Sequence, residues 1–355
     1  MKQLLAYCLS IILCVSFTGC MENYLDLYPE DKITSASFPE NESDIKLLLN
    51  GVYAQLREKE VYNQGLFGFG ITDGATPNAF NWGTDEVFNK LGAGRLSSSD
   101  GGVVTYRWKR CYEIISRANY LLACMDLVDL SEEAKAKYSG ETHFLRGLAY
   151  SVLAETYGGV PIILTNISTE EARSLKRASL EETWQQALDD YEVAITNLGV
   201  DAPEPGRATK GAALGMKMRA YLYQGKYKEV LACVEQIDAL KKYGLFHSYE
   251  GLFDPANENN KEVLFDIQYI EGENSQGSYI DQYCGTGTGS WTRGSRYVPT
   301  DDLVAAYETI DGSPVDPENP YENRDPRLGF TAVLPGSYFL GYRFPNYLYP
   351  GGAFN

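Results

Sequence analysis

Two loop segments of this chain combine tryptophan with side chains that form hydrogen bonds. Trp82 lies in the first segment, within 65–102, and Trp291 lies in the second, within 271–296. The face of a sugar ring packs on an aromatic plane, while its hydroxyls bond to amide, carboxylate and guanidinium groups. We therefore interpret both segments as candidate ligand-binding loops, with packing of the aromatics within the loops as the alternative. The neighbouring candidates are Asp73, Asn78 and Asn81 in the first segment, and Tyr283 and Arg293 in the second.

The chain offers few groups for catalysis. His143 and His247 lie in a predicted helix and a predicted loop, and no G-x-S-x-G or H-E-x-x-H motif occurs. The glycine-rich run at 285–289 lacks the lysine of a phosphate-binding loop. Adjacent acids at 189–190 and 301–302 diverge by about 100° on a helix, so we expect solvated helix faces rather than a glycosidase pair. The sequence therefore predicts a protein that is not an enzyme and needs no cofactor.

The cysteines do not form a metal-binding pattern. None belongs to a C-x-x-C pair, and with two histidines in the chain a zinc site has few ligands to draw on, so we expect no metal. Cys111 and Cys124 lie on different faces of a predicted helix and cannot bridge each other. We expect buried free thiols at these two positions and at Cys233 and Cys284, and a disulfide among the four stays open.

The N-terminus predicts export and lipid anchoring. Lys2 precedes an apolar run at 4–17 that is too short to span a bilayer. The run ends at Thr18-Gly19-Cys20, which is the cleavage pattern of a bacterial lipoprotein signal peptide. We expect residues 1–19 to be removed and Cys20 to carry palmitate, so that the protein contacts the membrane through its lipid alone. An ordinary signal peptide with a chance cysteine is the alternative.

The net charge of the chain is formally −17. Nucleic-acid binding needs clustered lysine and arginine to neutralise phosphates, so this acidic balance argues against a nucleic-acid partner. The acidic balance equally argues against electrostatic binding to anionic lipid. An acidic surface is neutral towards uncharged ligands such as sugars.

Apolar residues at helical spacing dominate the body of the chain and predict a mainly α fold with long loops and a few short strands. Residues 20–40 contain two prolines without a sustained period, which predicts an extended tether before a domain at 41–355. We expect a strand at 262–269 and a short helix at 303–307. The longer predicted helices begin at Asn41 and cover 103–127, 131–157, 180–198 and two helices within 210–240. The apolar stripe of the first helix is Ile45, Leu48, Leu49, Val52 and Leu56.

The two helices within 210–240 have the spacing of a tetratricopeptide unit, with a tight turn at Gly225 between them. Such helix pairs stack and bury a continuous core. We therefore expect Tyr221, Tyr227 and Leu231 to be buried. Trp108 and Trp184 also lie in helical patterns, where we expect core packing rather than ligand contact.

Six short segments, in order along the chain, resemble the SusD/RagB outer-membrane lipoproteins of the Bacteroidota. Each segment is weak evidence alone, but their order within one predicted lipoprotein is specific. The segments are 24–29 (YLDLYP), 49–53 (LNGVY), 117–122 (RANYLL), 144–150 (FLRGLAY) with 157–161 (YGGVP), 206–212 (GRATKGA) and 324–328 (RDPRL).

The resemblance implies a non-catalytic lipoprotein on the outside of the outer membrane. Such proteins capture oligosaccharide and deliver it to a TonB-dependent porin of the SusC type, and some bind other nutrients. Ligand residues vary among members, so none is carried over to this chain. Members usually continue well beyond the segment at 324–328, so we expect the domain to be truncated at its C-terminus. The alternative is a surface lipoprotein whose helical repeats bind a peptide or a protein.

Overall fold

The computed structural model describes residues 38–57, 72–81, 90–97, 99–269, 297–339 and 342–343. Helices dominate these residues, which confirms the mainly α prediction, and the two short strand pairs involve few residues. The helices of the first two thirds of the chain are α2 (Glu42–Tyr53), η1 (Ala54–Arg57), α4 (Val103–Cys124), α5 (Glu132–Tyr157), α6 (Thr169–Ser174), α7 (Leu180–Asn197), α8 (Lys210–Tyr223) and α9 (Tyr227–Ala239). The remaining elements are η2 (Thr72–Ala75), β1 (Ala79–Asn81), η3 (Gly251–Phe253), η4 (Pro255–Asn257), β2 (Tyr297–Pro299), α11 (Asp301–Ala306), α12 (Arg327–Thr331), β3 (Tyr338–Phe339) and β4 (Tyr342–Arg343).

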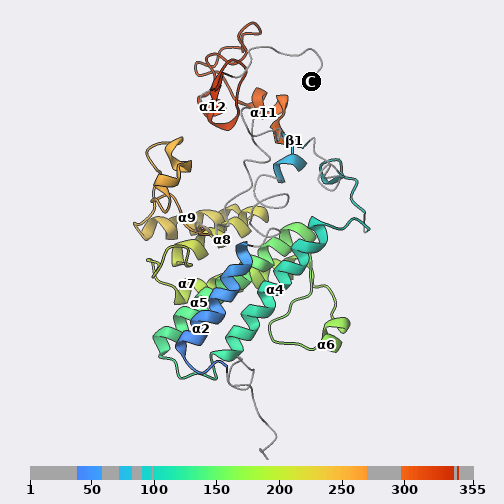
Figure 1. Cartoon of the computed structure of the whole chain (residues 1–355), viewed down its shortest axis with the longest axis vertical. Helices are drawn as coiled ribbons and strands as arrows, with labels where there is room; N and C mark the ends of the chain where they lie inside the picture. Colours follow the sequence, from blue (N-terminus) through green and yellow to red (C-terminus); the bar gives the residue numbers. More distant parts are fainter. Residues whose placement is uncertain are drawn as a thin grey trace, which may run out of the picture.

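The long helices form a layer in which successive helices pack against each other. Contacts run from α4 to α5, from α5 to α7, from α7 to α8 and from α8 to α9, and α2 lies against α4 and α5 (Figure 1). The segment with β1, α11 and α12 lies beyond one end of this helical layer (Figure 1). Neighbours along the sequence are thus neighbours in space, as expected for stacked helix pairs.

Capping residues set where the helices begin. The Asn41 side chain accepts hydrogen bonds from the backbone N–H groups of Ser43 and Asp44, and the Asp44 carboxylate accepts one from the Asn41 N–H. Ser179 and Glu182 form the same reciprocal box at the start of α7. Each box satisfies backbone donors that would otherwise have no partner within the helix.

The hydrophobic core follows the predicted apolar stripes. Along α2 and η1, four of the five predicted stripe residues are fully buried, and Leu48 is half-buried against the core. Trp184 is buried in α7, whereas Trp108 is half-buried and packs on the core from its edge. The fully buried stripe residues are Ile45, Leu49, Val52 and Leu56.

Three of the four cysteines expected to be buried free thiols are so in the structure: Cys111, Cys124 and Cys233. The fourth, Cys284, lies outside the described residues. Burial raises the pKa of the Cys111 thiol to about 12, which keeps it protonated.

The helix pair α8–α9 forms as predicted, but its predicted core is partly wrong. Gly225 has φ +69° at the turn, a conformation that glycine adopts without strain. Tyr221 packs against the core, whereas Tyr227 is 68% exposed and Leu231 is 64% exposed. Among the described residues α9 packs mainly on α8, and Cys233 is its one buried residue. In a tetratricopeptide array, a further helix covers the face of the second helix that points away from the first. The spacing of residues within one helix pair does not predict whether such a further helix is present.

The predicted strand at 262–269 is wrong. The segment pairs with no strand among the residues that the structure describes. Its apolar side chains pack on helices instead: the Phe265 ring lies 4.9 Å from that of Phe144, and Leu264 lies over Gly215 of α8. The apolar residues of this segment are therefore half-buried against helices, without joining a sheet among the described residues. The predicted short helix at 303–307 is confirmed as α11.

No helix in the described part of the chain combines the length and apolar character needed to cross a membrane.

Candidate functional site

An antiparallel strand pair joins the first segment of predicted ligand residues to the residues that follow the second segment in the sequence. β1 pairs with β2 in the register Ala79 with Pro299, Phe80 with Val298 and Asn81 with Tyr297. The Thr300 N–H donates to the Asn78 carbonyl at 3.0 Å and extends the pairing by one residue. Residues 79–81 of the first segment thus lie beside residues 297–299, which directly follow the second segment in the sequence.

The structure describes three of the predicted ligand residues, at least in part. Asp73 and Asn78 are exposed beside the strand pair, in η2 and in the turn that follows it. Asn81 has its backbone in β1, opposite Tyr297. The other predicted positions lie outside the described residues: Cys20, Trp82, Tyr283, Trp291 and Arg293.

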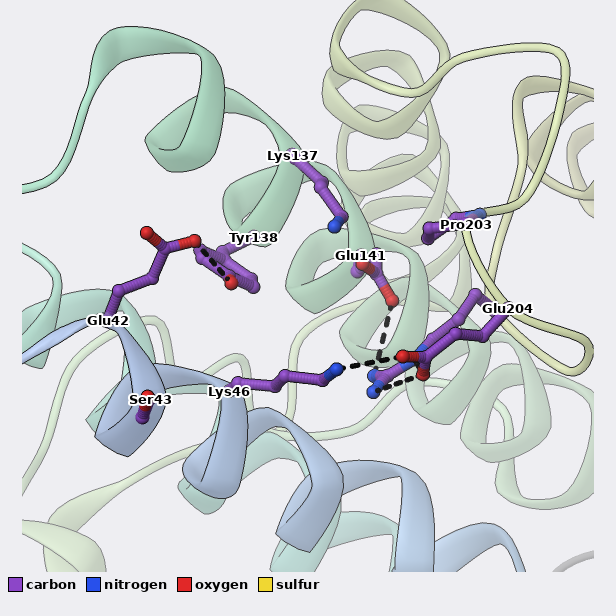
Figure 2. Close-up of a pocket in the computed structure, with 9 residues that line it drawn as sticks. Glu42, Ser43, Lys46, Lys137, Tyr138, Glu141, Pro203 and Glu204 are labelled. Carbon is purple, nitrogen blue, oxygen red and sulfur yellow. Dashed lines mark hydrogen bonds and ion pairs between the residues drawn. The ribbon is translucent and has the colours of Figure 1, made fainter.

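A second feature is a polar cavity of about 360 Å³ between the N-terminal halves of α2 and α5 and the loop before α8 (Figure 2). Sequence reasoning did not single out this cavity. Its lining brings together three basic and three acidic side chains from segments far apart in the sequence. The lining residues are Glu42, Ser43, Lys46, Lys137, Tyr138, Glu141, Pro203, Glu204 and Arg207.

A buried carboxylate forms the base of this cavity. Glu141 accepts a hydrogen bond from the Tyr53 hydroxyl at 2.7 Å, and Arg207 Nη1 lies 3.5 Å from the same carboxylate. Burial raises the pKa of Glu141 above its ordinary value, while the Tyr53 hydrogen bond and the charges of Arg207 and Lys137 oppose that shift. The Arg207 guanidinium also lies over the Tyr53 ring at 4.9 Å. The base of the cavity is therefore fixed by interlocking contacts.

The mouth of the cavity is more exposed. Lys46 Nζ forms an ion pair with Glu204 at 2.8 Å, and both side chains are about half-exposed. The Tyr138 hydroxyl donates to Glu42 at 2.8 Å. Lys137 extends from α5 towards the interior of the cavity (Figure 2).

The sequence contained only part of the signal for this cavity. Tyr53 and Arg207 lie in the segments 49–53 and 206–212, which resemble the SusD/RagB pattern. No sequence pattern pointed to Glu141 or Lys137, because each gains its neighbours from distant segments.

Other residues of the six family-like segments form buried polar contacts within the helical layer. Arg146 Nη2 lies 2.7 Å from Asp190, and Arg146 Nη1 donates to Asn119 Oδ1 at 2.8 Å. Asn119 in turn donates to the carbonyl of Ile163 at 3.0 Å. These contacts tie α4, α5, α7 and the segment after α5 together.

The expectation of a solvated helix face was wrong for Asp190. Asp190 is buried because it pairs with Arg146 of α5. Nothing in the local sequence of α7 indicates this burial. The expectation is confirmed for the other three acids of the two pairs, which are exposed: Asp189, Asp301 and Asp302.

The segment 324–328 has a similar structural role. Arg324 is buried and donates hydrogen bonds to the backbone carbonyls of Val304, Tyr307 and Pro320. These contacts hold the turn after α11 against the start of α12. The described residues of the family-like segments mostly stabilise the scaffold.

Two family models match the chain. The one described as "Starch-binding associating with outer membrane" matches residues 23–222, and the one described as the SusD family matches residues 261–352. SusD-like protein P25 of Formosa agariphila is 26% identical over 321 residues, which cover 84% of this chain and 58% of that protein.

Comparison with solved structures also finds SusD-like proteins. A SusD-like carbohydrate-binding protein from Bacteroides fragilis superposes with a TM-score of 0.75 at 29% identity, covering 85% of this chain and 61% of that one. A laminarin-binding SusD-like protein has a TM-score of 0.59 at 22% identity over 72% of this chain and 55% of that one, which shows a likeness of fold alone. The chain spans 48% to 59% of the length of the curated relatives it matches.

Proposed function

The chain belongs to the SusD/RagB family, and from this premise we propose that it is a cell-surface lipoprotein that captures oligosaccharide without cleaving it. It delivers the oligosaccharide to a TonB-dependent porin of the SusC type. The family description associates these proteins with the outer membrane, and a solved relative is described as carbohydrate-binding. The lipid on Cys20 and the partner porin are parts of this proposal.

The observation that supports the ligand site most directly is the pairing of β1 with β2. It places residues 79–81, in the segment that contains Trp82, beside residues 297–299, which directly follow the segment that contains Trp291 in the sequence. Trp82 follows Asn81 directly in the sequence, and Arg293 lies shortly before Tyr297. In the proposal, Trp82 and Trp291 stack on sugar rings. The proposed partners of the ring hydroxyls are Asp73, Asn78, Asn81, Tyr283 and Arg293.

Replacing either tryptophan by alanine is expected to weaken polysaccharide binding about tenfold. An aromatic contact contributes about 1 kcal/mol beyond the area it buries, and about 1.4 kcal/mol corresponds to tenfold in affinity. Isothermal titration calorimetry of Trp82→Ala and Trp291→Ala against a panel that includes laminarin and starch measures this loss. The saccharide should be recovered intact after incubation, because no bond is broken.

Trp184→Phe is the matched control, since Trp184 is buried in α7 and its replacement should leave affinity unchanged. Binding that both loop variants leave unchanged would contradict the proposed site. Peptides in the same panel test the alternative: binding of peptides with no response to any saccharide would favour the peptide-binding function.

Cys20→Ala is expected to abolish lipidation and to release the protein from the outer membrane. The reason is that the thiol of Cys20 is the acylation site in the predicted lipoprotein signal. Metabolic labelling with a palmitate analogue should mark the wild type and not the variant. Cys233→Ala is the control, and equal labelling of wild type and Cys20→Ala would overturn the prediction.

A further inference from the structure

We propose that the polar cavity between α2, α5 and the loop before α8 is a second saccharide site, which takes a single neutral sugar residue. This inference takes its ligand class, saccharides, from the proposed function, but the second site consists of other residues than the proposed loop site. The cavity lies at the N-terminal halves of α2 and α5, whereas the β1–β2 pair lies beyond the opposite end of the helical layer (Figure 1).

The size of the cavity fits a small ligand. Its volume of about 360 Å³ lies near the lower end of the range of small-molecule sites, roughly 300–1,000 Å³. A single sugar residue fits such a volume, whereas a long chain needs an extended groove.

The charges of the lining favour a neutral ligand. Lys46, Lys137 and Arg207 face three carboxylates, those of Glu42, Glu141 and Glu204, so the formal charges balance. Sugar hydroxyls both donate and accept hydrogen bonds, and such a lining offers ammonium donors beside carboxylate acceptors. An anionic ligand would meet the buried Glu141 carboxylate, and a cationic ligand would meet Lys137.

Lys137 is a lining group with unused hydrogen-bonding capacity. Its ammonium group carries three donors and lies 5.5 Å from the centre of the Tyr138 ring. It forms no ion pair with any residue that the structure describes. The contacts among Tyr53, Glu141 and Arg207 hold the neighbouring wall in place before any ligand enters. A rigid wall beside an available donor is what a preorganised binding site requires.

Saturation-transfer NMR on the full chain measures monosaccharide binding. Glucose, galactose and mannose at tens of millimolar are the probes, with glucuronate and glucosamine as charged counterparts. At least one neutral sugar should bind the wild type, and Lys137→Met should weaken that binding about tenfold, equivalent to about 1.4 kcal/mol. Lys137→Arg, which keeps the charge and donors, should retain most of the affinity.

Lys135→Met is the matched control. Lys135 lies on the same helix and pairs with Asp126 outside the cavity, so this variant should bind as the wild type does. Thermal unfolding of each variant checks that the fold is kept. The Trp82→Ala, Trp291→Ala double variant should lose polysaccharide binding and keep monosaccharide binding.

Three results would overturn the second site: no neutral monosaccharide binds, glucuronate or glucosamine binds more tightly than the neutral sugars, or Lys137→Met leaves affinity unchanged. Loss of monosaccharide binding in the double tryptophan variant would also overturn it while leaving the proposed function intact. Failure of the wild type to bind any polysaccharide would instead overturn the proposed function.

Discussion

Asp190→Ala is expected to lower the free energy of unfolding by about 3–5 kcal/mol, the usual cost of removing one partner of a buried ion pair. Both side chains of the pair are almost fully buried, with Arg146 7% and Asp190 2% exposed. Without Asp190 the guanidinium keeps its bond to Asn119 but loses the carboxylate that neutralises it. Urea unfolding followed by circular dichroism measures the change.

Asp189→Ala is the matched control, one residue earlier on the same helix. Asp189 is exposed and accepts one hydrogen bond from Gln185, so the free energy of unfolding should change by no more than about 0.5 kcal/mol. Similar losses in the two variants would show that the Arg146–Asp190 pair does not stabilise the helical layer.

Phe144→Ala is expected to destabilise the protein by about 3–5 kcal/mol, because it removes a fully buried aromatic side chain and leaves a cavity. The centre of the Phe144 ring lies 6.3 Å from that of Tyr191 in α7 and 4.9 Å from that of Phe265. The loss should therefore loosen the segment 262–269 as well as the helices. Thermal unfolding measures stability, and hydrogen exchange measures protection of the segment.

Phe253→Ala is the control, because it removes the same side chain from a position that is 72% exposed. The Phe253 ring lies 5.7 Å from that of Tyr249, so its removal should lower the free energy of unfolding by no more than about 1 kcal/mol. A stability loss at Phe144 no larger than that at Phe253 would contradict the assigned core.

The candidate loops show what could be predicted from the sequence and what could not. Composition identified two segments rich in aromatic and polar residues, yet nothing local indicated that residues 79–81 would pair with 297–299. Pairing between distant strands depends on how the intervening helices fold, so spacing within either segment carries no information about it. The polar cavity was missed for the same reason, because Lys46, Lys137 and Glu204 come from three separate segments.

The sequence by itself determined the helices and their beginnings. The apolar stripe from Ile45 to Leu56 and the capping boxes at Asn41 and Ser179 are local patterns, and local hydrogen bonding fixes them wherever the helix lies. Only the tertiary structure decided that Tyr227 and Leu231 remain exposed, that Asp190 is buried against Arg146, and that 262–269 packs on helices rather than in a sheet. Burial depends on which distant segment covers a side chain, and that partner is chosen by the packing of the whole domain.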